Sequence, residues 1–239
     1  MRRRFFVDQV RNGRAEISGG GARHLTRVLR VQPGQVYEIS DNRNVYLAEI
    51  ETARNGHVVF RTLEKLAAPE PPAQLILCAS LIKFDRLEWI IEKSTELGVA
   101  AVIPVVAARS EPGLGRAALK RLERWRRIAL ESSQQSRRAH LPEIREPVRF
   151  RAALETQAAC RFVLDEEPGG VPLAHAIAQC ADAGSLALLT GPEGGWTAGE
   201  RAAFLQAGWT RVTLGPSILR AETAALAAVA VTLHAKIQG

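Results

Sequence analysis

The segment LLTGPEGGWTAGE, residues 188–200, combines an apolar run with a glycine-rich turn that carries a carboxylate, Glu193, and no lysine. Glycine permits positive φ and a close approach of the backbone to a ligand, and Pro192 fixes the turn. A phosphate-binding turn would use cations, whereas Glu193 repels a phosphate and would either tolerate a ligand with positive character or anchor neighbouring backbone N–H groups. Neither the nucleotide-binding pattern GxxxxGK[ST] nor GxGxxG occurs in the chain.

A second segment, LGPSILRAETAALAAVA at residues 214–230, repeats the apolar run, glycine and proline. It then presents polar side chains, among them Arg220 and Glu222, before an alanine-rich stretch. Small residues allow another element to approach closely, either inside the domain or at a dimer interface. Spacing alone leaves two interpretations open for these loops, a cofactor pocket and two tight turns.

The elements that must position these loops follow from the alternation of apolar runs with helical patterns after residue 74. Such alternation predicts an α/β domain with a mainly parallel sheet covered by helices on both faces, and ligands of such sheets lie at the carboxyl ends of the strands. Asp85 and Thr197, each followed three residues later by glutamate, fit a helix-capping pattern. The strands are expected at 75–81, 99–107, 160–165, 185–191 and 210–215, and the helices at 85–98, 116–138, 172–181, 197–208 and 222–237.

The first 66 residues show short alternating or aromatic pieces broken by turn residues, which is typical of a small β-rich domain with one helix at 22–30. The proline-rich segment AAPEPPA, residues 67–73, is a stiff connector. We therefore predict domains at 1–70 and 71–239.

Charge is unevenly distributed in this chain, whose formal net charge is +7. Residues 1–30 hold eight arginines against two acidic residues, and residues 109–151 hold twelve basic against five acidic residues. Two basic segments favour a polyanionic partner, although arginine-rich helix faces exposed to water give the same pattern. The three cysteines are widely spaced and no stretch has the length of a membrane span, so we expect no disulfide, no metal site and a cytoplasmic protein without a membrane anchor.

The two glycine loops, together with HLTRVLR at 24–30, KFDRLEWIIEKSTELGV at 83–99, IPVVAARS at 103–110 and ESSQQSRRAHLPEI at 131–144, resemble the RsmE-type 16S ribosomal RNA (uracil-N3)-methyltransferases of the SPOUT class. The matching segments lie in order over nearly the whole chain. The resemblance implies a trefoil-knotted α/β domain, a small N-terminal PUA-like β-barrel that helps to hold RNA, and a homodimer. It implies S-adenosylmethionine as the cofactor and 16S ribosomal RNA or the small ribosomal subunit as the partner.

The resemblance also implies residue roles. Arg220 is the candidate for stabilising charge on uracil, and Glu222 is either a base or a structural partner. The cofactor-binding candidates are Leu189, Gly191, Gly195, Leu214, Gly215, Ser217, Ile218, Leu219 and Thr223. Ser217 replaces an arginine that is frequent in the family. The RNA-binding candidates are Arg23, His24, Arg27, Arg30, Lys83, Arg109, Gln135 and Arg138. Two other functions stay open, a ribose 2′-O-methyltransferase of the same class and a non-catalytic RNA-binding assembly factor.

Overall fold

The computed structural model describes residues 3–54, 56–68, 71 and 73–238, and the chain divides into two compact units. The first unit contains Met1–Glu70 together with Ser133–Leu141, and the second contains Pro71–Ser132 and Pro142–Gly239. The predicted domain boundary falls after Glu70, which lies outside the described residues, as do parts of the predicted connector.

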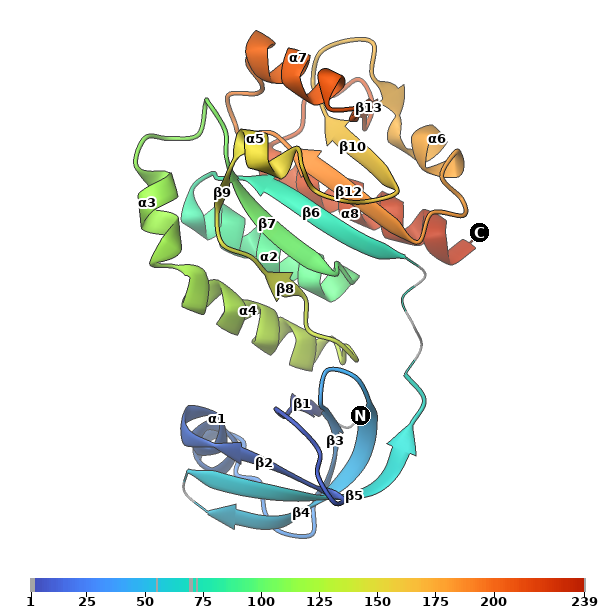
Figure 1. Cartoon of the computed structure of the whole chain (residues 1–239). Helices are drawn as coiled ribbons and strands as arrows, with labels where there is room; N and C mark the ends of the chain where they lie inside the picture. The colour runs from blue at the N-terminus through green and yellow to red at the C-terminus, as the bar shows by residue number, and fades with distance from the viewer. Residues whose placement is uncertain (1–2, 55, 69–70, 72, 239) are drawn as a thin grey trace. The chain divides into compact units, whose positions relative to one another are not determined.

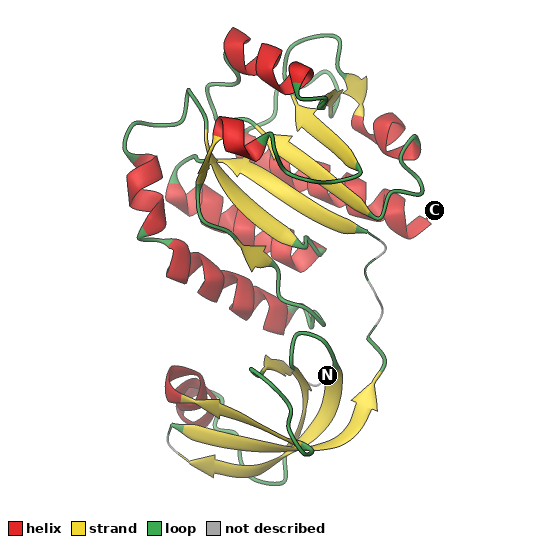
Figure 2. Ribbon diagram, in the orientation of Figure 1, coloured by secondary structure: helices red, strands yellow, loops and turns green. Residues whose placement is uncertain are grey.

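The first unit is built on a curled mixed sheet (Figures 1 and 2). Its strand order is β1-β3-β4-β5-β2, in which β1 and β3 are parallel and the other pairs are antiparallel. Alternate side chains such as Ile39, Ile50 and Phe60 form its buried core. The strands are β1 (Arg4–Phe6), β2 (Arg14–Ser18), β3 (Val36–Ser40), β4 (Val45–Arg54) and β5 (His57–Leu66).

The helix predicted at 22–30 begins earlier and has two parts, α1 (Gly19–Arg23) and the π-helical turn η1 (His24–Val28). Ala22 and Leu25 are buried in the core of the first unit, and this burial holds the glycine-rich turn in a helical conformation despite its low intrinsic propensity. Tertiary packing therefore overrides the local preference of three consecutive glycines.

The segment 133–141 is fastened to the first unit by polar contacts. The Arg4 guanidinium donates to the carbonyl oxygen of Arg137 at 2.6 Å, and the Ser40 hydroxyl donates to that of Ala139, also at 2.6 Å. The buried carboxylate of Glu38 accepts hydrogen bonds from both Arg4 and Arg137. These long-range contacts explain why a segment distant in sequence belongs to this unit.

The second unit contains a sheet in the order β11-β13-β10-β12-β6-β7-β8, with β9 also paired to β7. Every pairing between the described strands of this sheet is parallel, as the sequence predicts. Its strands are β6 (Gln74–Ser80), β7 (Ala101–Val106), β8 (Glu143–Ile144), β9 (Val148–Arg149), β10 (Cys160–Leu164), β11 (Val171–Pro172), β12 (Ser185–Thr190) and β13 (Thr210–Thr213).

Helices cover both faces of this sheet, as Figures 1 and 2 show for α8 on one side and α5 and α7 on the other. Successive residues of a strand enter different cores, since Leu188 packs with α2 and α8 whereas Leu189 packs with α5 and α7. Burial on both faces accounts for the continuous apolar runs. The helices are α2 (Phe84–Leu97), α3 (Leu114–Leu119), α4 (Leu122–Gln135), α5 (Phe150–Ala153), α6 (Leu173–Ala178), α7 (Ala198–Gln206) and α8 (Ala221–Gln238).

Local helix predictions had mixed outcomes. The capping box at Thr197 is confirmed, because its hydroxyl accepts from the Glu200 N–H and the Glu200 carboxylate accepts from the Thr197 N–H. The cap predicted at Asp85 is wrong, since α2 begins one residue earlier, after Lys83, and Asp85 lies inside the first turn. The single helix predicted at 116–138 is also wrong, because the chain breaks between α3 and α4.

The absence of a disulfide, expected from the wide spacing of the cysteines, is contradicted by a bond between Cys160 and Cys180. Cys160 begins β10, and Cys180 follows α6, whose residues pack in the same core as the strand. The return of the chain through α6 brings together two residues separated by 20 positions. Cys78 stays unpaired and buried in β6.

Candidate functional site

A cavity of about 660 Å³ lies where three neighbouring strands of the second unit end. Strand β10 is paired on one side to β13 and on the other to β12, so the loops that follow these strands lie side by side. Leu164–Glu166, Thr190–Gly195 and Val212–Ala221 form most of the wall. Lys83 and Arg86, at the start of α2, and Ala224 of α8 complete it. The site therefore lies at the carboxyl edge of a parallel sheet, where ligands of α/β proteins bind.

Two glycines of the loop after β12 have little room for a side chain. Gly195 has φ +67°, and a Cβ atom there would lie 2.1 Å from Oε1 of Glu166. A Cβ atom on Gly191 would approach the Trp196 ring to 3.1 Å. Trp196 is itself fixed, because its indole N–H donates to the carbonyl oxygen of Leu164 at 2.8 Å. The loop is thus packed against the end of β10 and leaves backbone atoms facing the cavity.

The loop after β13 exposes apolar side chains. Its turn is closed by the Thr213 hydroxyl, which accepts from the Gly215 N–H at 3.2 Å, and Gly215 has φ +128°. Ile218 is 87% exposed although its side chain is a large aliphatic one, and Leu219 is also exposed. Both line the cavity, which makes them suitable to cover an apolar part of a ligand.

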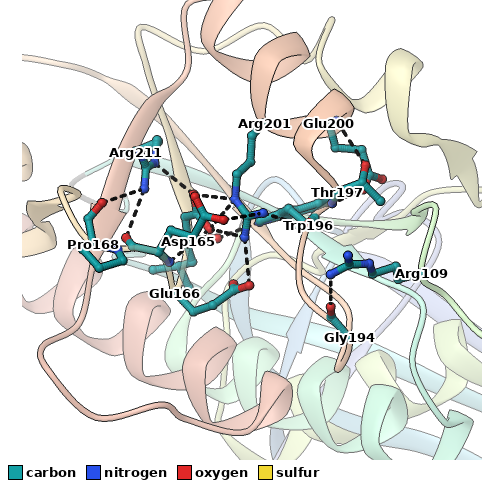
Figure 3. A network of polar contacts seen from close by, with 12 residues as sticks. Arg109, Asp165, Glu166, Pro168, Gly194, Trp196, Thr197, Glu200, Arg201 and Arg211 are labelled. Atoms are coloured by element: carbon teal, nitrogen blue, oxygen red, sulfur yellow. Dashed lines mark hydrogen bonds and ion pairs between the residues drawn. The ribbon is translucent and has the colours of Figure 1, made fainter.

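A buried ion-pair network fixes the strand exits (Figure 3). The Asp165 carboxylate, fully buried after β10, accepts from Nε of Arg201 at 3.1 Å and lies 2.9 Å from Nε of Arg211. Arg201 also donates to the carbonyl oxygen of Trp196, and Arg211 donates to that of Pro168. The hydrogen bond to Asp165 raises the pKa of Arg201. Asp165 is thereby neutralised and serves as an anchor between loops.

Charged groups at the cavity are arranged around Arg86. Its guanidinium pairs with Oε1 of Glu193 in the glycine turn, and its Nε lies 3.8 Å from Oε1 of Glu222 at the start of α8. The second carboxylate oxygen of Glu222 is buried without a hydrogen-bond partner among the described residues. Among those residues, the Arg220 guanidinium has no ion-pair or hydrogen-bond partner, and it lines the cavity.

The structure brings most of the predicted cofactor residues together. The cavity wall contains Gly191, Gly195, Leu214, Gly215, Ser217, Ile218, Leu219 and Arg220. Leu189 instead lies in the core between the sheet and helices α5 and α7, where it packs with Trp196. Thr223 and Glu222 lie in the first turn of α8 and are not part of the cavity wall.

Sequence reasoning missed Asp165, Glu166 and Arg86 as residues of this site. The first two follow the run CRFVL, and a strand exit beside the two glycine loops was a signal that could have identified them. Arg86 had no such signal, because its position depends on how α2 packs against the sheet. Within the described part of the chain, no group of three or more His, Cys, Asp or Glu side chains could hold a metal ion.

The predicted RNA-binding residues lie in both units. Arg23, His24, Arg27 and Arg30 are all exposed in or next to α1 and η1 of the first unit. In the same unit Arg138 is half-buried and donates to the carbonyl oxygen of His140 at 3.0 Å, and burial lowers the pKa of Arg138 to about 10. Gln135 is exposed at the end of α4.

The other two predicted RNA-binding residues belong to the second unit, near the cavity. Lys83 lines the cavity, and the Arg109 guanidinium donates to the carbonyl oxygen of Gly194 at 2.7 Å.

None of the described helices combines the length and apolar character needed to cross a membrane.

Comparison with known proteins identifies the class to which this fold and site belong. Residues 69–233 match the family model described as RNA methyltransferase domain. Over 95% of this chain and 94% of the relative, the sequence is 32% identical to Ribosomal RNA small subunit methyltransferase E of Bacillus subtilis. It is 33% identical to the protein of that name from Mycobacterium bovis, over 94% and 88% of the two chains. The chain belongs to the ribosomal RNA small subunit methyltransferase E family.

Solved structures agree with this family. The crystal structure of Ribosomal RNA small subunit methyltransferase E from Neisseria gonorrhoeae, bound to S-adenosyl methionine, has a TM-score of 0.85 and 28% identity, and the match covers 96% of each chain. A Legionella pneumophila protein in complex with the cofactor SAM has a TM-score of 0.86 and 26% identity, with 98% of each chain covered.

Proposed function

We propose that this protein transfers the methyl group of S-adenosylmethionine to N3 of a uridine in 16S ribosomal RNA of the small ribosomal subunit. The observation that carries the proposal is the cavity formed by two glycine loops at the carboxyl edge of the sheet, in a member of this methyltransferase family. Backbone atoms, apolar side chains and the carboxylate of Glu193 suit a positively charged sulfonium donor. When bound, the donor supplies an electrophilic methyl group.

The proposed chemistry needs help from the chain because N3 of uracil is a poor nucleophile while it carries a proton. Loss of that proton places negative charge on O2 and O4, which a fixed cation stabilises. Arg220 suits this role, since its guanidinium lines the cavity and pairs with no other described residue. A planar guanidinium can also present two N–H groups to the edge of the base.

Glu222 has two candidate roles, acceptor of the N3 proton or structural partner of a nearby cation. Its contact with Arg86 and its place outside the cavity wall support the structural role. A glutamine substitution separates the two. If Glu222 accepts the proton, Glu222→Gln loses activity over the whole pH range. If it is structural, the residual rate still rises with pH as N3 ionises.

The experiment that tests the function is analysis of the product. Small-subunit RNA or particles are incubated with the protein and S-adenosylmethionine, digested to nucleosides and examined by mass spectrometry. We expect 3-methyluridine. A 2′-O-methylated nucleoside would replace the proposal with ribose methylation, and RNA binding without any methylated product would favour an assembly factor.

The role of Arg220 is tested by Arg220→Ala in single-turnover assays. The expected loss is about 10²-fold in the methyl-transfer rate, as for one preorganised charge-stabilising donor. Donor affinity should change much less, because the charge on uracil develops mainly in the transition state. Arg43→Ala is the matched control, since Arg43 is exposed and lies outside both basic segments. A wild-type rate in Arg220→Ala would contradict the assignment.

The basic residues of the first unit support a role for that unit in RNA binding. Arg23, Arg27 and Arg30 are exposed within eight positions of one another, so they can contact neighbouring phosphates. We infer that this curled sheet is the PUA-like barrel implied by the sequence resemblance. Lys83, Arg109, Gln135 and Arg138 complete the proposed RNA contacts. We also propose a cytoplasmic location, which a ribosomal RNA substrate supports.

From the sequence resemblance we also propose a trefoil knot in the second unit and a homodimer, and helix α8 supports the homodimer. Helix α8 carries half-buried apolar residues, including Leu226, Ala227, Ala230 and Val231. A second copy of this helix would remove that surface from water, and two-fold dimers are the commonest closed assembly. Light scattering at micromolar concentration tests this, and an active monomer would contradict it.

A further inference from the structure

The cavity contains an ion pair between residues that are distant in the sequence. Arg86, at the start of α2, pairs with Glu193 in the glycine turn and also lies near Glu222 at the start of α8. One guanidinium thus connects a carboxylate of the glycine turn with a carboxylate of helix α8. Nη1 of Arg86 faces Glu193, whereas its Nε faces Glu222.

The two carboxylates differ in how firmly they are held. The Glu222 side chain is 16% exposed and stands on the first turn of a helix, whereas the Glu193 side chain is 37% exposed on a turn. Partly exposed ion pairs contribute little to stability, so separation of Glu193 from Arg86 costs little. Glu222 can keep the guanidinium in place while Glu193 exchanges its partner.

A ligand that carries one positive and one negative group can replace the Arg86–Glu193 ion pair by binding each of the two side chains. The amino-acid end of S-adenosylmethionine has an α-carboxylate and an α-ammonium on the same carbon, which are complementary to a neighbouring arginine and glutamate. The other acids of the wall are less suitable, because Asp165 is neutralised by Arg201 and Arg211, and Glu166 pairs with Arg201 at 2.9 Å.

We propose that Arg86 and Glu193 bind the amino-acid end of the donor, with Arg86 on the α-carboxylate and Glu193 on the α-ammonium. Glu222 is then a positioning residue that holds Arg86. This inference rests on the proposed function, because it names the subsite within the same cavity. It also explains the carboxylate in the glycine turn, which accepts the ammonium group.

The test compares, for each ligand, the affinity of a variant with that of the wild type. S-adenosylhomocysteine keeps both charged groups of the amino-acid end, and 5′-methylthioadenosine lacks both. Decarboxylated S-adenosylmethionine keeps only the ammonium and, unlike the other two, has a sulfonium centre, which the comparison with the wild type cancels for Arg86→Gln. Calorimetry measures their affinities for the wild-type protein, Arg86→Gln and Glu193→Gln. Arg126→Gln is the matched control, because Arg126 is a half-exposed helical arginine paired with Glu123 away from the cavity.

For Arg86→Gln we expect affinity for S-adenosylhomocysteine to fall about 10-fold or more, as for loss of a charge-assisted hydrogen bond. Affinities for 5′-methylthioadenosine and decarboxylated S-adenosylmethionine should change less than about 3-fold, since neither has a carboxylate. Glu193→Gln should weaken the two ligands that carry the ammonium and leave 5′-methylthioadenosine unchanged. Glu222→Gln should reproduce the pattern of Arg86→Gln in weaker form.

Two results would overturn the inference. Equal losses for all three ligands in Arg86→Gln would mean that Arg86 only shapes the cavity, and unchanged affinities in a folded variant would remove it from the site. The wild-type protein tests the proposed function separately. If it binds neither S-adenosylmethionine nor S-adenosylhomocysteine, the donor assignment fails, whereas normal wild-type binding with either result above refutes the subsite alone.

Discussion

Substitution of Gly195 by alanine tests whether the glycine turn is conformationally required. The backbone there has φ +67°, which costs an alanine about 1–2 kcal/mol, and the new Cβ atom would lie 2.1 Å from Oε1 of Glu166. Glu166 can rotate away, but it then leaves Arg201, a loss of about 0–1 kcal/mol for a partly exposed pair. We expect Gly195→Ala to lower the free energy of unfolding by about 1–3 kcal/mol and to weaken donor binding.

Gly199 provides the matched control four residues away. It lies in α7, has no neighbour within 4 Å of an added Cβ atom and has no positive φ. Gly199→Ala should therefore stabilise the protein by about 0.5–1 kcal/mol through higher helix propensity. Urea unfolding gives both free energies, and calorimetry gives donor affinity. Equal stability and equal donor affinity of Gly195→Ala and the wild type would refute the required turn.

Two further predictions concern ionisable groups of the second unit. Burial raises the pKa of the Cys78 thiol to about 11, so the thiol stays protonated at pH 8 and iodoacetamide should label it only after unfolding. Reduction of the Cys160–Cys180 disulfide should add two thiols that react in the native protein, as counted by mass spectrometry. Rapid labelling of Cys78 in the native protein would contradict this prediction. A hydrogen bond from Arg124 lowers the pKa of Glu88, so its stabilisation is present above the normal carboxyl pKa and is lost as pH falls through the lowered value. Glu88→Gln should therefore cost about 1 kcal/mol at pH 7 and progressively less below about pH 4 by urea unfolding, and a cost independent of pH would contradict the ion pair.

Local patterns in the sequence were sufficient to predict strands β6, β7, β10, β12 and β13, the two glycine loops and the capping box at Thr197, but not the two-residue strands β8, β9 and β11. Continuous apolar runs predict buried parallel strands, and the topology confirms this sheet. The break between α3 and α4 was missed, because no glycine or proline marks Lys120 and Arg121. The disulfide was missed because its formation depends on how α6 returns beside β10, which cysteine spacing does not encode. Elements encoded by a few neighbouring residues could be predicted, whereas the disulfide, which depends on how distant segments pack, could not.

The site shows the same distinction. The loops that form the wall could be recognised from glycine, proline and strand exits, whereas Arg86 enters through the packing of α2. Asp165 follows a recognisable strand, but its role depends on Arg201 and Arg211, which lie 36 and 46 positions further along the chain and approach it only in the folded sheet. The sequence therefore indicates which loops form the binding site, but it does not indicate which charged side chains the fold brings to it.

The buried network around Asp165 has a consequence for the shape of the pocket. Three loops form most of the wall, so the fit of a ligand depends on the relative positions of these loops. Asp165 follows β10, Arg211 belongs to β13, and Arg201 holds the carbonyl oxygen of Trp196 in the loop after β12. One carboxylate therefore connects all three strand exits. Because a buried charge that loses its partner is costly, this connection keeps the exits together and the pocket formed before a ligand enters.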